Sequence, residues 1–288
     1  HLLYKGMTLP IYTRNEIKVM LILGLVLFCP KSVWGSFESE NYSPLQNAAG
    51  AAPFSLVPNS LGIISDPTGL TRNQRLFFAG SQHNKFGLKS LKESLFVVGG
   101  SFRGFGLGLG ISNFGNPTYQ ELLITAMGTK QIKDGLKIAI SYNLYQLNIK
   151  NYGQDLSHGL GFIMRFNMNP FVESMVSLLN VNRPTIGKTK EKLPQIIMAG
   201  LLLKPSEKIL AQVSLVQDTE FPVSIRFGII MKLMDEFGIA FGMVHQPNAF
   251  TAGAFINFKN IKLELACLSY VDLGFITYQT GISFSRNP

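Results

Sequence analysis

The sequence is poor in charged residues and in cysteine, and each shortage narrows the class of protein. Only 15% of its 288 residues are charged, whereas 46% are hydrophobic. An average soluble domain has about 25% charged residues, so the balance points away from that class. Cys29 lies in the leader described below, which leaves Cys267 with no partner for an internal disulfide. An exported protein of this composition needs another source of stability, and a closed network of strands in lipid supplies one.

Long hydrophobic runs are also missing after the first 35 residues, where no stretch of about 18 uncharged apolar residues occurs. A short apolar run at residues 19–28 (VMLILGLVLF) follows Arg14 and Lys18 and precedes a small-residue exit at Gly35. A basic flank, a core of about 7–15 apolar residues and a small residue at the cut predict a secretory signal peptide over residues 1–35. An uncleaved anchor is the alternative, although a spanning helix needs about 20 apolar residues.

Nucleic-acid binding is disfavoured despite the basic balance of the chain. The formal net charge is +9, yet the lysines and arginines are scattered singly, without an arginine-rich run or a cluster of aromatic and basic residues. Backbone neutralisation and base stacking on nucleic acid need such clusters. The basic residues therefore predict a solvated rim, and no nucleic-acid partner is expected.

Alternation of large apolar residues with small or polar ones recurs along the chain. In residues 275–285 one face carries Ile276, Tyr278, Thr280, Ile282 and Phe284. The opposite face carries Thr277, Gln279, Gly281, Ser283 and Ser285. A period of two indicates strands. In a soluble sandwich the second face is usually charged, whereas small and polar residues suit the interior of a narrow barrel with an apolar outside in lipid. The pattern predicts an all-β fold, a transmembrane antiparallel β-barrel.

The runs number fourteen, and they place the barrel over residues 75–288. Twelve strands is the alternative, because three of the runs alternate poorly: 118–128, 172–180 and 194–204. The fourteen expected strands are 75–83, 93–103, 104–113, 118–128, 134–147, 157–168, 172–180, 194–204, 208–217, 221–233, 236–246, 249–258, 261–271 and 273–285. The longest candidate loops, 148–156 and 180–193, are modest and basic.

Four charged residues fall on the face that the alternation assigns to the lumen, namely Arg165, Arg226, Lys262 and Glu264. A charge removed from water is costly unless it is paired. Lys262 and Glu264 stand two residues apart on one strand face, so they are expected to pair with each other.

The segment ahead of the first strand, residues 36–74, has a different character. Much of it is rich in Ala, Gly, Ser and Pro, without a strand pattern. We expect it to fold inside the barrel as a plug, or hatch; an ordinary flexible leader is the alternative. Residues 60–64 are expected to make one helical turn that Pro67 stops.

A motif in this segment resembles a known family. The run Ser60-Leu61-Gly62, followed by Asp66-Pro67-Thr68-Gly69-Leu70, is similar to the hatch motif of outer-membrane proteins related to the long-chain fatty-acid transporters. Their PorV- and PorQ-like relatives are closest to it in size, and the spacing of Arg226 and Gly228 also resembles that branch. One departure is Asp-Pro-Thr in place of the commoner Asn-Pro-Ala. The resemblance implies these plug residues: Ser60, Gly62, Asp66, Pro67, Gly69 and Leu70.

The resemblance also implies a function and a location. The first expectation is a passive conduit for small hydrophobic molecules such as fatty acids, in the outer membrane of a Gram-negative-type bacterium. The alternative is a PorV-like accessory of type IX-type secretion that binds secreted proteins at the outer membrane. Expected partners are the lipid bilayer, lipopolysaccharide and the barrel-assembly machinery, together with the hydrophobic ligand or the secreted protein.

Enzyme chemistry finds no convincing support in the sequence. The glycines of residues 104–110 lack the Gly-x-Gly-x-x-Gly spacing of a nucleotide loop and are better explained as strand glycines facing the lumen. Ser157 and His158 are adjacent on a strand and so point to opposite faces. The histidines stand alone without metal-ligand spacing. We expect no catalytic residues, no cofactor and no metal.

Overall fold

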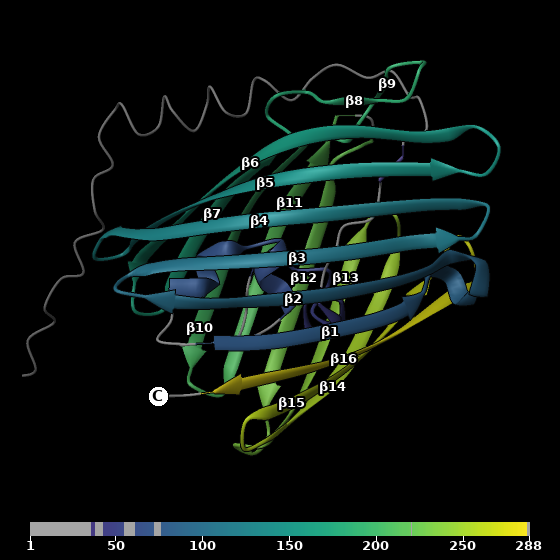
Figure 1. Ribbon diagram of the computed structural model, residues 1–288. Helices are drawn as coiled ribbons and strands as arrows, with labels where there is room; N and C mark the ends of the chain where they lie inside the picture. Colours follow the sequence, from purple (N-terminus) through teal and green to yellow (C-terminus); the bar gives the residue numbers. More distant parts are fainter. Residues whose placement is uncertain (1–35, 38–42, 55–60, 72–75, 220, 287–288) are drawn as a thin grey trace, which may run out of the picture.

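The computed structural model describes residues 36–37, 43–54, 61–71, 76–219 and 221–286. The predicted signal peptide and Ser60 of the plug motif lie outside the described residues. Within them, fourteen antiparallel strands form one closed barrel in which β1 pairs with both β2 and β16. Closure leaves no unpaired sheet edge, the condition for strands to cross a bilayer. Figure 1 shows the strands wrapping around a lumen that holds the short helical segments.

The strands match the expected runs one for one, so the predicted fold and the count of fourteen are confirmed. They are β1 Leu76–Asn84, β2 Lys92–Phe102, β3 Phe105–Asn116, β4 Tyr119–Lys133, β5 Leu136–Ile149, β6 Gly153–Asn169, β7 Val172–Leu179, β10 Ile196–Ser206, β11 Ile209–Asp218, β12 Ser224–Lys232, β13 Phe237–His245, β14 Ala249–Phe258, β15 Ile261–Tyr270 and β16 Phe275–Arg286.

The alternative of twelve strands is wrong, and the interior of the barrel explains why it arose. The strands β4, β7 and β10 are full members of the barrel. On β7 and β10 the inward positions include Met175, Met198 and Leu202, which are buried. Their apolar side chains pack inside the barrel instead of facing water. Both faces of these strands are therefore apolar in part, and the alternation is blurred.

The structure contains one of the two longest expected loops and not the other. Residues 180–193 do form a long connection, which carries a small hairpin of β8 Thr185–Ile186 and β9 Glu191–Lys192. The expected loop at 148–156 is wrong, because β5 continues to Ile149 and β6 begins at Gly153. Register pairing of Ile149 with Gly153 extends this pair of strands to a tight turn.

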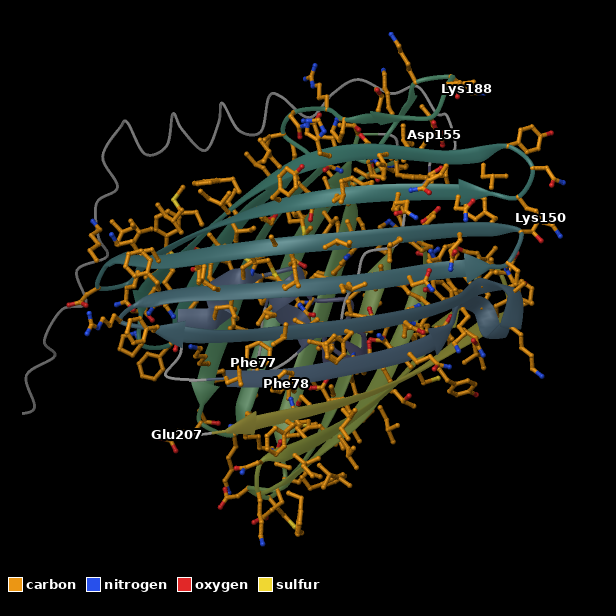
Figure 2. All side chains as sticks on the ribbon, in the orientation of Figure 1. Phe77, Phe78, Lys150, Asp155, Lys188 and Glu207 are labelled. Atoms are coloured by element: carbon orange, nitrogen blue, oxygen red, sulfur yellow. The ribbon has the colours of Figure 1, made fainter. Side chains whose placement is uncertain are left out.

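The large apolar side chains that the alternation assigns to one face of each strand lie on the outside of the barrel. Phe77 is fully buried and its neighbour Phe78 is 42% exposed, so adjacent side chains of β1 point to opposite sides (Figure 2). Large apolar side chains stand exposed around the barrel, among them Leu107, Phe241, Leu265 and Ile282. An outward band of this kind matches a lipid environment. Within the part of the chain that the structure describes, no helix has the length and apolar character needed to cross a membrane.

A charge placed in the lipid-facing band is expected to destabilise the barrel. Leu265, in the middle of β15, and Val271, in the following turn, are both 56% exposed. Leu265→Arg is expected to lower the free energy of unfolding by about 2–4 kcal/mol, because it places a charge at the depth of the bilayer midplane. Val271→Arg is the matched control and is expected to cost about 0–1 kcal/mol. Urea unfolding in phospholipid vesicles measures both, and equal costs would contradict a bilayer around β15.

The described parts of the N-terminal segment lie inside the barrel. They contain the short helix α2 Pro44–Ala48 and two turns of 3-10 helix, η1 Leu61–Ile64 and η2 Pro67–Thr71. The expected turn at 61–64 is present, but Pro67 does not simply stop it. It opens the second turn, where a residue without an N–H is tolerated. The helix α2 contacts strands of the β13–β16 wall, and η2 contacts strands from β2 to β6.

Candidate functional site

The helix α2 rests on a floor of glycines on the barrel wall. Gly228 and Gly242 are direct partners across β12 and β13. A Cβ atom at Gly228 would lie 2.0 Å from the carbonyl oxygen of Ala49, and one at Gly242 would lie 2.1 Å from the backbone nitrogen of Gly50. Neither position has room for any side chain. The glycines therefore permit the chain after α2 to approach the wall at backbone distance.

The wall also satisfies the carboxyl end of α2. The last carbonyls of a helix lack partners within it. Here the carbonyl of Ala48 accepts a hydrogen bond from Thr251 Oγ1 at 2.8 Å, and the next carbonyl along the chain accepts one from Gln212 Nε2 at 3.0 Å. Arg226 Nη1 donates to the carbonyl of Ala51 at 3.1 Å. At the other end Ser43 caps the helix. Side chains of the lumen thus complete a helix too short to persist alone.

A buried ionic network joins the second part of the N-terminal segment to the opposite wall. Asp66 Oδ2 lies 2.7 Å from Arg165 Nη1, and Arg165 Nε donates to Glu173 Oε2 at 2.8 Å. Lys204 pairs with the second oxygen of Glu173. Arg165 is 2% exposed and Asp66 fully buried. Two acids alternate with two bases, so each buried charge faces an opposite one, as burial requires.

The departure of the motif from Asn-Pro-Ala has a structural role in this network. Asp66 supplies the negative charge that Arg165 meets, and an asparagine there would not. The backbone N–H of Thr68 donates to Asp66 Oδ1 at 3.1 Å, and the Thr68 hydroxyl donates to the same oxygen. Asp66 thus closes its own turn with one oxygen and ties that turn to β6 with the other.

Glycines of β2 and β3 receive the two helical turns. A Cβ atom at Gly106 would lie 2.4 Å from Leu70 Cβ, and one at Gly110 would lie 2.7 Å from Ile64 Cδ1. Gly104 is different, since it lies in the turn before β3 with a φ of +79°. Alternation alone predicts only that these glycines face the lumen. The structure adds that their lack of side chains leaves space for the side chains of η1 and η2.

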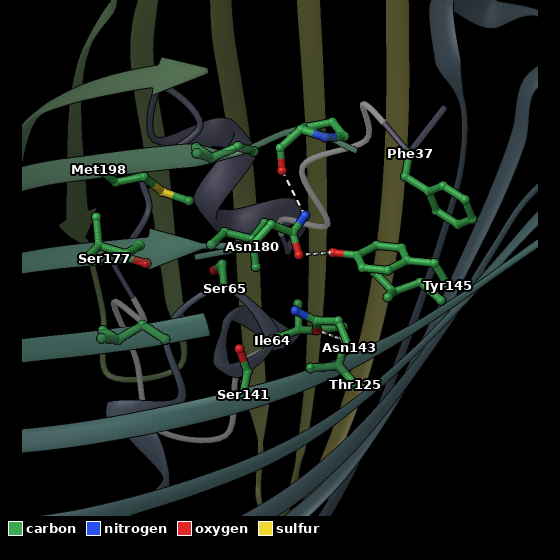
Figure 3. Close-up of a pocket in the computed structure, with 16 residues that line it drawn as sticks. Phe37, Ile64, Ser65, Thr125, Ser141, Asn143, Tyr145, Ser177, Asn180 and Met198 are labelled. Atoms are coloured by element: carbon green, nitrogen blue, oxygen red, sulfur yellow. Dashed lines mark hydrogen bonds between the residues drawn. The ribbon is translucent and has the colours of Figure 1, made fainter. Parts of the chain in front are cut away.

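Between η1 and the wall of β4, β5, β6, β7 and β10 a cavity remains. Its volume is about 70 Å³. Figure 3 shows the side chains that surround it. The lining is mixed, with apolar members such as Ile64, Leu123, Ile163 and Met198 and polar members such as Thr125, Ser141, Asn143 and Asn180.

Most polar side-chain atoms of this lining are hydrogen-bonded to other groups of the protein. The Tyr145 hydroxyl donates to Asn180 Oδ1 at 2.9 Å, and Asn180 Nδ2 donates to the carbonyl of Pro194 at 2.7 Å. Thr125 Oγ1 donates to Asn143 Oδ1 at 2.8 Å. No residue that lines the cavity is charged. The cavity therefore suits a neutral, largely apolar occupant.

The four charged residues assigned to the lumen belong to separate places in the structure. Lys262 Nζ lies 2.7 Å from Glu264 Oε1, and Glu264 also accepts from the backbone N–H of Leu45. Arg226 holds the chain after α2, whereas Arg165 holds Asp66. Each one anchors the N-terminal segment or lies beneath it. In the chain as described, no three metal-ligating side chains gather into a possible metal site.

The residues of the cavity were not singled out by the sequence as a site. Alternation does place Ser141 and Asn143 on the inward face of β5. It gives no sign that Asn143 is paired across the sheet with Thr125, or that Asn180, after the end of β7, folds back to meet Tyr145. Register and loop folding bring these residues together.

The fold is shared with solved outer-membrane channels. The toluene transporter TodX of Pseudomonas putida matches with a TM-score of 0.62 and 11% identity, over 88% of this chain and 100% of that one. The toluene transporter TbuX of Ralstonia pickettii matches with a TM-score of 0.60 and 10% identity, over 87% and 99%. The CymD monoaromatic hydrocarbon channel matches with a TM-score of 0.59 and 11% identity, over 88% and 99%.

These likenesses concern the fold. They bear out the predicted all-β barrel of fourteen strands. No protein-family model matches the sequence. No curated protein matches it either.

Proposed function

We propose that the protein is an outer-membrane conduit for small hydrophobic molecules, and that these molecules occupy the cavity between η1 and the β4–β10 wall. The observation that carries the proposal is the cavity itself. It is a largely apolar space of about 70 Å³ beside the docked N-terminal segment. Binding sites for small molecules are typically concave and apolar, with a few placed polar groups. The passage needs no energy source, because a ligand moves down its own concentration gradient.

The size of the cavity indicates the size of the ligand. An apolar cavity of about 150 Å³ holds one benzene molecule, and this cavity, at about 70 Å³, is about half that size. It accepts a short alkyl segment or part of an aromatic ring, and the rest of a larger molecule extends beyond it. The similar structures include toluene transporters and a monoaromatic hydrocarbon channel, proteins named for small apolar molecules.

Uptake by cells tests the proposal. A Gram-negative host without its own hydrophobic channels is expected to take up labelled toluene faster when it carries this protein, because lipopolysaccharide otherwise slows the entry of apolar molecules. The comparison is with cells carrying the empty vector, at equal amounts of toluene. Equal initial rates, with the barrel shown to be folded by its heat-modifiable mobility on gels, would contradict the proposal.

The second expectation, an accessory of secretion, stays a prediction. Its best test is a deletion strain, in which unimpaired protein export would count against it. The cavity between η1 and the β4–β10 wall faces the lumen and not the outer rim, which favours the conduit.

A further inference from the structure

One polar atom of the cavity is left without a partner. The side-chain nitrogen of Asn143, Nδ2, is buried and has no hydrogen-bond partner among the described residues. Asn143 as a whole is 3% exposed. Its other amide atom, Oδ1, accepts a hydrogen bond from the Thr125 hydroxyl. Figure 3 shows the nitrogen of Asn143 directed into the space between η1 and the wall.

A buried donor without an acceptor costs free energy, so the site is more stable when something accepts from it. The other polar groups do not supply the acceptor. Asn180 Oδ1 is engaged by Tyr145, and the carbonyl of Pro194 is engaged by Asn180. Asn143 lies far enough from these groups that its nitrogen makes no bond with them. An acceptor must come from the occupant of the cavity.

We propose that Asn143 Nδ2 donates a hydrogen bond to the ligand, and that the preferred ligand is a neutral, single-ring molecule carrying one acceptor oxygen, such as an aromatic ketone. The inference rests on the proposed function and narrows its substrate class. A carboxylate is disfavoured, because no charged side chain lines the cavity to pair with it. A plain hydrocarbon leaves the donor unpaired.

Two ligands of the same shape isolate this hydrogen bond. Acetophenone has a carbonyl oxygen where α-methylstyrene has a CH₂ group, and the two are otherwise alike. Their dissociation constants are measured by calorimetric titration of the purified protein, with protein-free detergent as the blank. Asn143→Leu removes the donor at similar volume. It is expected to shift the preference between the two ligands by roughly fivefold to tenfold away from acetophenone, the amount that one hydrogen bond contributes.

Ile140→Leu is the matched control. Ile140 lies on the outward face of the same strand, is 59% exposed and does not line the cavity, so the preference for acetophenone is expected to stay within about twofold of wild type, well short of a full hydrogen bond. A second measurement needs no variant: the carbonyl stretch of carbon-13 labelled acetophenone bound to the wild-type protein is expected at lower frequency than in hexane. An unshifted band would overturn the inference.

The outcomes separate this inference from the proposed function. If both ligands bind and Asn143→Leu changes their ratio no more than Ile140→Leu does, the donor role is overturned while the conduit stands. If neither ligand binds the wild-type protein saturably, both proposals are overturned.

Discussion

Replacing Arg165 with methionine is expected to release the N-terminal segment from β6 and lower the free energy of unfolding by about 3–5 kcal/mol. The guanidinium is 2% exposed and lies between Asp66 and Glu173, so its removal leaves Asp66 buried without its cation. The size of the effect comes mainly from this uncompensated charge. Urea unfolding in vesicles measures the stability, and ion conductance in a planar bilayer measures whether the lumen opens.

The matched control removes the charge of the three buried members of the network. Asp66→Asn, Arg165→Met and Glu173→Gln together leave no buried carboxylate in this network, and Lys204 is 28% exposed and reaches water. Replacing a complete buried ion network is often neutral, whereas removing one member is not. The triple variant is therefore expected to regain most of the stability that Arg165→Met loses. Equal stability of the wild type and Arg165→Met would contradict the role of this network.

Gly242→Val is expected to expel the chain after α2 from the wall. Its first side-chain carbon alone would lie 2.1 Å from the Gly50 nitrogen and 2.5 Å from the Gly50 Cα atom. Backbone cannot yield as a flexible side chain does, so overpacking here is expected to cost about 3 kcal/mol or more. The barrel strands remain paired, because the clash concerns only the segment inside them. Conductance is expected to rise above that of wild type.

Gly128→Val is the control for this variant. Gly128 lies on the outward face of β4, and a Cβ atom there would meet nothing closer than Leu107 Cδ2 at 3.9 Å. Valine favours strands, so stability is expected to change by less than about 0.5 kcal/mol and conductance to stay at the wild-type level. A rise in conductance with both variants would show that the strand, and not the docked segment, responds to the substitution.

Alternation located most strands of the barrel because it depends on the chain alone. Side chains of a strand point to opposite faces whatever the neighbouring strand is. Thus β16 could be read from residues 275–285 without knowing that it pairs with β1. The same local reasoning placed Lys262 and Glu264 on one face, where they lie 2.7 Å apart.

The candidate site required information that local patterns lack. Asp66 and Arg165 were noted separately, one in a motif and one on an inward face, and they meet across 99 residues. Their contact depends on where the N-terminal segment crosses the lumen. Thr125 and Asn143 are 18 residues apart and become partners through the register of β4 and β5. Register is set by the whole barrel, and no property of either residue encodes it.

The most direct test of the account is the uptake of labelled toluene by cells carrying Met198→Trp. Met198 lines the cavity on β10, and tryptophan there fills the space. Leu201→Trp, on the outward face of the same strand, is the control. The account predicts that Met198→Trp reduces the protein-dependent rate to near that of empty-vector cells while Leu201→Trp keeps the wild-type rate. Wild-type uptake by a folded Met198→Trp barrel would contradict the claim that the molecules pass through this cavity.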